Sequence, residues 1–326
     1  WGNAYNGSNI LSGRTLPYSM IKLSLSPVKW LEYNYIHGWL ASNIIDSNLS
    51  YITSNGNNRY VMRNKMIAAN MISFRPVKNL YLNFGNSVVY SDVNFQFQYL
   101  IPFMVYKIVD DNYNGTNNLA GQNTQMFFDV SSRNIKYLHL YASLFIDELS
   151  FKRMFDKQKQ SNYISLKTGV KFSGLPKTFS FTFEYTRTNP NTYQHFIPTT
   201  TFSSGDICLG NYLGSNAEEF YTELAYRPLQ NLQLQLSYTY MHKGTDYIYG
   251  VGEPWGLPFM EKTIFYNHIA ALKVEWEFMN NCFVYLHSYL YNTGGNKEII
   301  NKYNPAYFQK VSGLPLTLMT GFNIGF

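Results

Sequence analysis

Charged residues are scarce in this chain. Asp, Glu, Lys and Arg make up 14% of its 326 residues, whereas an ordinary soluble domain carries about 25%. The net charge of +6 is spread along the sequence, with no Lys/Arg run and no glycine-rich phosphate loop. The sequence therefore lacks the usual signatures of nucleic-acid binding, and we expect no nucleic-acid partner.

Long apolar runs and cysteines are also lacking. No stretch of about 18 consecutive apolar residues occurs, which excludes a helical membrane span. The only cysteines, Cys208 and Cys282, do not have metal-binding spacing and form one disulfide or none. The six histidines are scattered without ligand spacing. We expect neither a metal nor another cofactor.

Aromatic residues and alternating patterns are abundant instead. Tyrosine (29) and phenylalanine (24) dominate an aromatic content of 18%. Apolar and polar residues alternate over segments 178–187, 231–240, 270–278 and 314–326, the two-residue period of a β-strand. In 270–278 one face carries charges, which a dry core would not accept but a hydrated lumen does. The pattern predicts an all-β fold, a transmembrane antiparallel β-barrel.

Turn residues divide the chain into about thirteen strands. We expect them near 17–25, 28–39, 60–74, 78–89, 124–132, 135–148, 161–173, 178–189, 217–227, 231–242, 265–279, 282–292 and 314–326. Connections at one end are short and those at the other are long, as in bacterial barrels with short periplasmic turns and long extracellular loops. Residues 1–326 are thus predicted to form a single barrel domain of the cell outer membrane.

The predicted number of strands, thirteen, is odd. Single-chain bacterial barrels normally have an even number of strands, so we expect an odd number of strands before Trp1. The hydrophobic segment 95–109 does not add a span, because the strands on either side of it already have compatible directions and Pro102 would interrupt a ladder. We predict that it is part of a long loop that folds inward or packs over the barrel mouth.

Charged residues of both signs occupy the positions predicted to face the lumen. They are Lys22, Glu32, Asp129, Asp147, Lys167, Lys171, Glu184, Glu223, Lys273, Glu275 and Glu277. They could form a selective pore lining, or a polar network that holds the lumen closed. Mixed signs suit internal pairing better than selection of one ion sign.

The long loops combine aromatic and polar side chains. A sugar offers an apolar ring face and fixed hydroxyl groups, so such loops are candidate glycan contacts. The alternative is an interfacial aromatic girdle. The residues predicted to contact glycan are Arg187, Tyr193, His195, Asp206, Tyr247 and Trp255.

Catalytic signatures are lacking. The sequence has no G-x-S-x-G elbow, and its nearest constellation, Glu184, Arg187 and His195, is better interpreted as a salt-bridged strand end. We therefore expect no catalytic residues and no enzymatic activity.

Short motifs occur in order over most of the chain. They are Trp1-Gly2 with Leu11-Ser12 and Pro17-Tyr18, Trp30-Leu31-Glu32-Tyr33 with His37-Gly38, Gln98-Tyr99-Leu100-Ile101-Pro102, Ile146-Asp147-Glu148-Leu149, Glu184-Tyr185-Thr186-Arg187 with Asn191-Thr192-Tyr193-Gln194-His195, and Leu209-Gly210 with Leu213-Gly214-Ser215-Asn216-Ala217. Together they resemble the Wzi-like capsule-assembly outer-membrane proteins. Asn86 departs from the pattern, because the resemblance leads us to expect Glu there.

The resemblance implies a barrel of about eighteen strands with a small periplasmic helical element. It also implies a surface lectin that helps to anchor or organise capsular polysaccharide. The Tyr- and Asn-rich, charge-poor style is similar to that of Bacteroidota relatives. Expected partners are outer-membrane lipid and lipopolysaccharide, surface or capsular polysaccharide, and other outer-membrane proteins.

A second function class fits the same strand pattern. The barrel could be a transport or secretion component, either a solute pore or an accessory barrel of a larger envelope complex. A pore predicts an open lumen, whereas an accessory barrel predicts a large apolar contact on one outer wall. The strand pattern is the same in each case.

Overall fold

The computed structural model describes residues 1–92, 96–101, 103–108, 122–151, 162–174, 178–248, 256–303 and 315–325. Within these ranges, no helix is both long and apolar enough to span a membrane.

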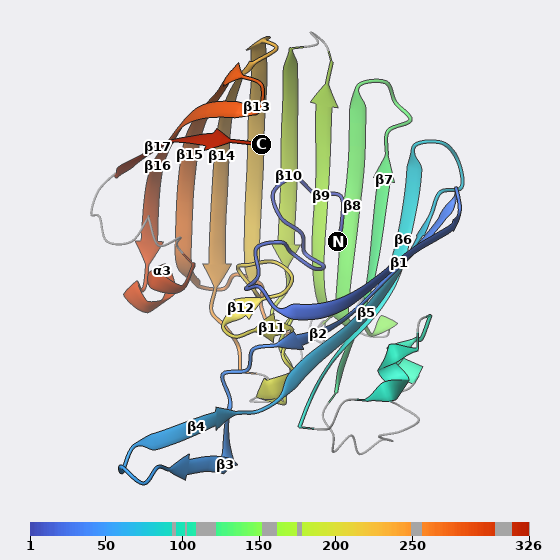
Figure 1. Cartoon of the computed structure of the whole chain (residues 1–326), viewed down its shortest axis with the longest axis vertical. Coiled ribbons are helices and arrows are strands. Elements are labelled where there is room, and N and C mark those ends of the chain that lie inside the picture. The colour runs from blue at the N-terminus through green and yellow to red at the C-terminus, as the bar shows by residue number, and fades with distance from the viewer. Residues whose placement is uncertain are drawn as a thin grey trace.

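One antiparallel sheet of thirteen strands dominates the fold (Figure 1). Its strands, in spatial order, are β1 (Ser19–Val28), β2 (Leu31–Leu40), β5 (Lys65–Phe74), β6 (Leu80–Ser91), β7 (Asn123–Ser132), β8 (Leu138–Glu148), β9 (Tyr163–Ser173), β10 (Phe179–Thr188), β13 (Ala217–Leu229), β14 (Leu232–Gly244), β15 (Thr263–Met279), β16 (Cys282–Gly295) and β17 (Leu316–Ile324). Spatial order follows chain order, and the predicted count of thirteen is confirmed.

Smaller elements are inserted between these strands. They are the hairpin β3 (Ile45–Ile52) and β4 (Asn58–Met62), the 3-10 helices η1 (Phe97–Leu100) and η2 (Pro198–Thr200), the short pair β11 (Ser203–Ser204) and β12 (Ile207–Cys208), and the helix α3 (Lys297–Tyr303). The β3–β4 hairpin projects away from the sheet (Figure 1). The strand predicted at 60–74 was therefore too long, because its first residues belong to β4.

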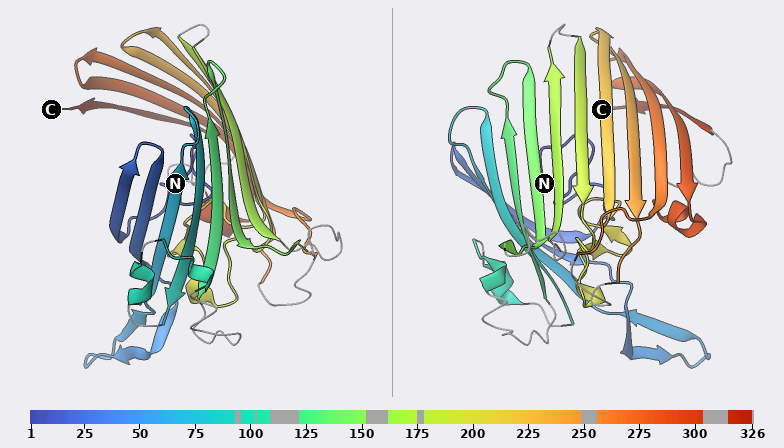
Figure 2. Two further views of the ribbon diagram at one scale, coloured as in Figure 1. Left: turned by 90° about the vertical axis from the view of Figure 1, so that its right-hand side faces the viewer. Right: turned by 180° about the vertical axis from the view of Figure 1, so that it is seen from behind.

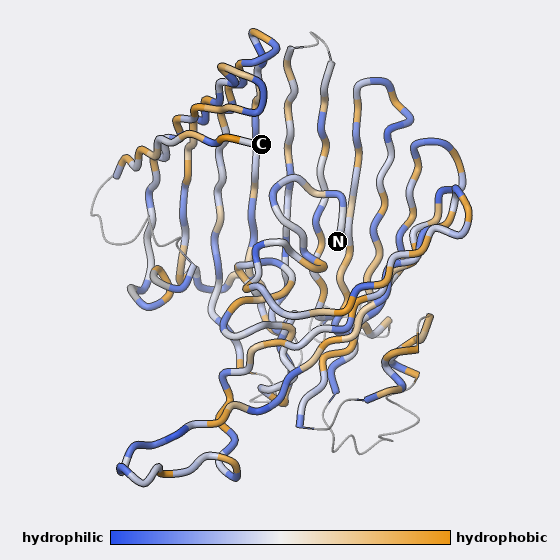
Figure 3. Tube along the Cα trace, in the orientation of Figure 1, coloured by the Kyte–Doolittle hydropathy of each residue, from blue (hydrophilic) through white to orange (hydrophobic). Residues whose placement is uncertain are grey.

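The sheet is an arc with β1 and β17 as its two edges (Figure 2). Directly opposed residues of antiparallel strands point to the same side, so the register carries each face from strand to strand. On the convex face Leu224, Leu236 and Leu272 lie opposite one another on β13, β14 and β15 and are 42%, 55% and 43% exposed. Hydrophobic and hydrophilic residues alternate along the strands (Figure 3). An exposed apolar band of this kind is what lipid requires.

The short connections lie at one end of the sheet and the long ones at the other, as predicted. Asn79 and Asn281 occupy two of the short turns with φ of 63° and 60°, a left-handed conformation that asparagine adopts more easily than most residues. Arg133 and Gly325 donate backbone hydrogen bonds to the carbonyls of these two asparagines at 2.9 and 2.8 Å. These bonds fix each turn to the neighbouring strand end.

Residues 1–16 lie against the concave face of the sheet (Figure 1); we call them the plug. Residues 189–216, between β10 and β13, fold onto the plug, and we call them the inner loop. Apolar side chains from both segments and the wall form the main buried cluster, including Ile10, Phe127, Phe145, Phe202 and Leu209. The interior is thus filled by chain that carries no long regular element.

The predicted position of segment 95–109 was wrong. Its described part, residues 96–101 and 103–108, packs on the convex face of β2, β5 and β6 rather than inside the barrel or over the mouth. Asn70 and Asn86 share that face, and their side-chain amides donate to the carbonyl of Met104 at 2.8 and 3.2 Å. Polar residues that face outward from the wall draw this segment to the outside.

Gly169 on β9 is a packing constraint of the concave face. A Cβ there would lie 2.2 Å from Cζ of Tyr141, whose hydroxyl donates to Glu184 at 2.5 Å. We expect Gly169→Val to displace the ring and lower the free energy of unfolding by about 1–3 kcal/mol, measured by urea titration in detergent. Gly13→Val, at a position with open space around it, is the matched control. An unchanged midpoint for Gly169→Val would contradict this packing.

Candidate functional site

A buried ion pair anchors the plug. Lys167 of β9 and Glu184 of β10 share the concave face, and Nζ of Lys167 lies 2.9 Å from Oε2 of Glu184. Glu219 of β13 is also close, with Oε1 3.9 Å from the same Nζ. The three side chains are at most 2% exposed. A buried charge is stable only with partners and hydrogen bonds, and the plug supplies the remaining ones.

The plug backbone binds directly to this ion pair. The amides of Tyr5 and Asn6 donate to the two carboxylate oxygens of Glu184 at 2.5 and 3.1 Å. Lys167 donates to the carbonyl of Asn6 at 3.2 Å, and the Asn6 side chain donates to Glu219 at 3.1 Å. Wall charges therefore satisfy the polar groups of a segment that has no secondary structure of its own.

Further contacts hold the beginning of the plug. The Asn3 side chain donates to Oδ1 of Asp129 at 2.5 Å, and Asn83 donates to the same oxygen at 2.5 Å. The Tyr5 hydroxyl lies 2.9 Å from Nδ1 of His139, and the ammonium of Lys171 lies 4.2 Å from the Tyr5 ring centroid. The plug is thus bound to the concave face from β7 to β13.

The inner loop closes over the plug at the long-loop end. The amide of Ser12 donates to the carbonyl of Leu209 at 2.7 Å, and the amide of Tyr193 donates to Asp147 of β8 at 2.8 Å. Burial raises the pKa of the Cys208 thiol to about 12 and also raises the pKa of Tyr193. Cys208 is a free, neutral thiol in this interior.

His195 of the inner loop is held neutral. Its Nδ1 lies 2.7 Å from Oγ1 of Thr200 and accepts the amide of Ile197 at 3.4 Å. Burial, together with the charge of Lys107, lowers the pKa of His195 to about 4. A protonated Nδ1 could not accept the Ile197 amide, so the loop favours the neutral ring.

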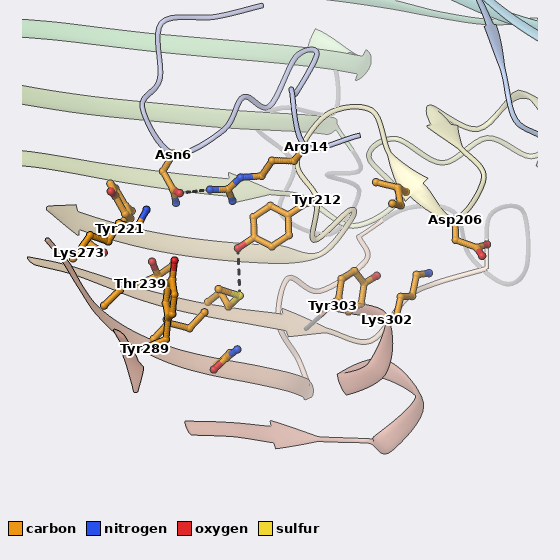
Figure 4. A pocket seen from close by; sticks show the side chains of 16 residues that line it. Asn6, Arg14, Asp206, Tyr212, Tyr221, Thr239, Lys273, Tyr289, Lys302 and Tyr303 are labelled. Atoms are coloured by element: carbon orange, nitrogen blue, oxygen red, sulfur yellow. Dashed lines mark hydrogen bonds between the residues drawn. The ribbon is translucent and has the colours of Figure 1, made fainter. Parts of the chain in front are cut away.

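A cavity of about 520 Å³ remains beside the plug. Figure 4 shows it between Asn6 and Arg14 of the plug, Tyr212 of the inner loop, the concave face of β13 to β16, and α3. Its labelled lining residues are Asn6, Arg14, Asp206, Tyr212, Tyr221, Thr239, Lys273, Tyr289, Lys302 and Tyr303. The labelled lining therefore contains four tyrosines, three cations and one carboxylate, together with the amide of Asn6 and the hydroxyl of Thr239.

Internal contacts orient the aromatic lining. The guanidinium of Arg14 lies 5.1 Å from the ring centroid of Tyr212 and donates to the Asn6 side chain. The hydroxyl of Tyr212 donates to Glu219 and contacts the sulfur of Met241 at 3.3 Å. Tyr221 donates to Glu223 at 2.7 Å. These bonds fix ring positions, so the lining is preorganised.

The residues predicted to contact glycan do not converge on one place. Asp206 lines the cavity and accepts from Asn43 at 2.6 Å. Tyr193 is 4% exposed in the main buried cluster, and Arg187 faces the convex side, 3.8 Å from the ring centroid of Phe259. Tyr247 donates to the carbonyl of Pro258 at 2.9 Å. Trp255 lies outside the described residues.

The register places the predicted lumen charges on the concave face, with Asp147 at a bulge of β8 beside the inner loop. They do not form a single network. Lys167 and Glu184 pair, Asp129 binds the plug, and Lys273 lines the cavity. Glu275 lies 3.4 Å from His287, and Glu277 accepts the amide of Asn281 at 2.9 Å.

The sequence analysis did not single out most of the cavity residues. Tyr221 and Tyr289 occupy inward positions of strands that also point polar residues such as Glu219, Glu223 and His287 inward, and this alternation was the available signal for them. Arg14 and Tyr212 carry no periodic signal, because both lie in irregular segments that come together only through the fold. Among the described residues, no three His, Cys, Asp or Glu side chains gather as a metal site would require.

An apolar convex wall, a polar concave face and short turns at one end define the strand architecture of an outer-membrane β-barrel. The sequence matches the family of the capsule assembly protein Wzi over residues 1–281, and the chain belongs to that family. Comparison with curated protein sequences gives no match.

The fold is shared with a solved structure, the Escherichia coli outer-membrane protein Wzi, described as a carbohydrate-binding β-barrel involved in group 1 capsule assembly. It is 13% identical with a TM-score of 0.54, and the match covers 91% of this chain and 62% of Wzi. A weaker match is OccD3 of Pseudomonas aeruginosa, 8% identical with a TM-score of 0.47, covering 94% of this chain and 68% of OccD3. The chain is thus an outer-membrane protein that matches less than two thirds of the length of E. coli Wzi.

Removal of the Glu184 carboxylate should release the plug. We expect Glu184→Ala to leave the more distant Glu219 as the nearest carboxylate to Lys167, a loss of about 3–5 kcal/mol for a broken buried pair. Hydrogen exchange of residues 3–14 should rise strongly, measured by mass spectrometry. Glu275→Ala, at a half-exposed position of the concave face, should leave this exchange unchanged. Equal protection in both variants would show that the pair does not hold the plug.

Acid should loosen the inner loop through His195. The pKa of His195 is about 4 in the fold and near 6.5 when unfolded, so the unfolded loop binds an extra proton between these values. The stability contributed by this group is therefore lost as pH falls from about 6.5 to 4. We expect exchange of residues 189–216, corrected for intrinsic rates, to be faster at pH 5 than at pH 7. In His195→Gln the exchange of these residues should no longer differ between pH 5 and pH 7. A difference that persists in this variant would show that another group is responsible for the pH dependence.

Proposed function

We propose that the protein binds surface or capsular polysaccharide without catalysis, as a lectin-like component of capsule assembly, and that the cavity beside the plug is its binding site. One observation carries the proposal: a preorganised cavity lined by tyrosines and hydrogen-bonding groups lies inside a barrel of the Wzi family. Its volume falls within the range of about 300–1,000 Å³ typical of small-molecule sites.

The lining has the chemistry that a sugar needs. Tyrosine rings offer an apolar face together with a polar edge, and Asn6, Thr239 and the ammonium groups offer donors and acceptors for hydroxyl groups. Arg14, Lys273 and Lys302 outnumber the single lining carboxylate, Asp206. This balance favours a glycan that carries acidic groups.

The plug supports a binding role over an open pore. It crosses the concave face from β7 to β13 and is fixed by buried charges, so a solute path along this wall would require its removal. The role of an accessory barrel in a larger complex remains the second candidate. The outward-facing segment on β2, β5 and β6 favours it, because it gives this part of the outer wall a distinct surface.

Aromatic substitution in the cavity tests the proposal. We expect a Tyr221→Ala, Tyr289→Ala double variant to bind purified acidic capsular polysaccharide about tenfold more weakly, a loss of about 1.4 kcal/mol, measured by titration calorimetry in detergent. Tyr238→Ala, on the convex face at 42% exposure, is the matched control. Cells that express the double variant should also release polysaccharide into the medium.

Charge substitution tests the glycan class. Lys273→Gln with Lys302→Gln should weaken binding of an acidic polysaccharide and reduce its salt dependence, while binding of a neutral one stays unchanged. Unchanged binding in both the aromatic and the charge variants would exclude the cavity. Absence of binding by the unaltered protein, with its capsule retained after gene deletion, would overturn the lectin role itself.

A further inference from the structure

Residues 96–101 and 103–108, which we call the strap, lie on the outside of the barrel wall. Tyr99 and Tyr106 are 1% and 0% exposed and pack on Met66, Val88 and Tyr90 of β5 and β6. All three partners share the convex face with Asn70 and Asn86. The strap is therefore buried against the side of the sheet that carries the lipid-facing leucines of β13 to β15.

Side chains of the wall satisfy the backbone of the strap. The hydroxyl of Tyr35 donates to the carbonyl of Tyr99 at 2.8 Å, and the hydroxyl of Tyr33 accepts the amide of Phe103 at 3.0 Å. Asn86 accepts the amide of Tyr106 at 2.9 Å, in addition to its bond to the carbonyl of Met104. Irregular backbone at membrane depth is tolerated only where protein groups satisfy it. Wall side chains of β2, β5 and β6 therefore provide hydrogen-bond partners for the backbone of the strap.

The opposite side of the strap is apolar. Phe97, Ile101, Val105 and Ile108 are 75%, 53%, 44% and 59% exposed, Lys107 is the exposed charge among the described strap residues, and most of the strap has hydrophobic colours in Figure 3. Such a surface suits contact with acyl chains. The strap thus covers part of the outer surface of β2, β5 and β6 and forms an apolar ridge on it.

An apolar groove of about 430 Å³ lies at the tip of this ridge. The Phe103 ring packs against Tyr33 in a tilted arrangement with a centroid distance of 4.0 Å, and Leu25, Leu31 and Ile72 complete the groove. Ser26 and Pro27, at the bulged end of β1, also line it. The groove therefore opens beside the short-turn end, which is the periplasmic end in bacterial barrels.

Cations gather on the turns at this end. The sequence Pro-Val-Lys occurs twice, at 27–29 where β1 ends and its turn begins, and at 76–78 between β5 and β6. The two turns adjoin, because the amide of Arg75 donates to the carbonyl of Trp30 at 2.8 Å and its guanidinium donates to the carbonyl of Lys29. Lys29 and Lys78 are exposed. Neither segment 26–31 nor segment 75–80 contains Asp or Glu, so the three positive charges have no acidic neighbour in either turn.

We propose that this groove and these turns form a site for an anionic phospholipid of the periplasmic leaflet. One acyl chain lies in the groove between Phe103 and Ile72, and the phosphate group lies at Lys29, Lys78 and Arg75. Basic clusters at the membrane surface attract anionic headgroups, and a groove that holds the chain restricts the headgroup to these turns. The site is separate from the cavity inside the barrel.

Lipid binding to the purified protein tests the site. The protein in detergent is mixed with phosphatidylglycerol or with phosphatidylcholine of the same acyl chains, and bound lipid is counted by native mass spectrometry. We expect at least fivefold higher occupancy by phosphatidylglycerol. Lys29→Gln with Lys78→Gln should reduce it to the phosphatidylcholine level. Lys136→Gln, on the short turn between β7 and β8, is the matched control and should have no effect.

A second variant tests the groove. Ile72→Trp should fill it and lower occupancy by both lipids, with folding checked by the heat-dependent gel shift of barrels; if this variant does not fold, Ser26→Phe tests the same space. Equal occupancy by the two lipids would overturn the proposal. So would a preference for phosphatidylglycerol that survives the double Lys substitution, or a bound protein that covers the strap and excludes lipid.

Discussion

The ion pair between Lys167 and Glu184 joins two neighbouring strands to the chain segment that occupies the interior. Because each partner is almost fully buried, loss of either one leaves an uncompensated charge, and the backbone amides of Tyr5 and Asn6 add the remaining bonds to the carboxylate. With Asn6 fixed, Arg14 reaches the ring of Tyr212. One wall of the cavity therefore depends on a contact made on β9 and β10.

The strand architecture could be predicted because every second residue of a membrane-spanning strand faces lipid and is therefore apolar. The alternation in β10 and β14 follows from it, and so do the number and order of the sheet strands. The β3–β4 hairpin escaped prediction, since it lies beyond the sheet, where this rule no longer applies. The plug could not be predicted for a related reason. Its amides bind wall side chains such as Glu184, which is distant in sequence, and a local sequence pattern does not indicate such a partner.

The site was less predictable than the fold. The long loops and the end of β10 were predicted to contact glycan because they combine aromatic and polar side chains, yet Tyr193 packs in the interior and Arg187, on β10, faces outward. Whether a loop tyrosine contacts solvent or core depends on how the loop folds, which sequence pattern does not determine. Tyr289, in contrast, faces inward by strand parity alone. Strand positions were therefore the better guide to the lining than loop composition.

The plug and the strap solve one physical problem on opposite faces of the same wall. Irregular backbone without strand partners must find hydrogen bonds elsewhere when water is excluded. Glu184 and Lys167 provide them inside, with charges, because the lumen is polar. Asn70 and Asn86 provide them outside, with neutral amides, because a charge facing lipid would cost more. Asn86, which departs from the residue expected for the family, is thus suited to a wall that holds a segment on its outer face.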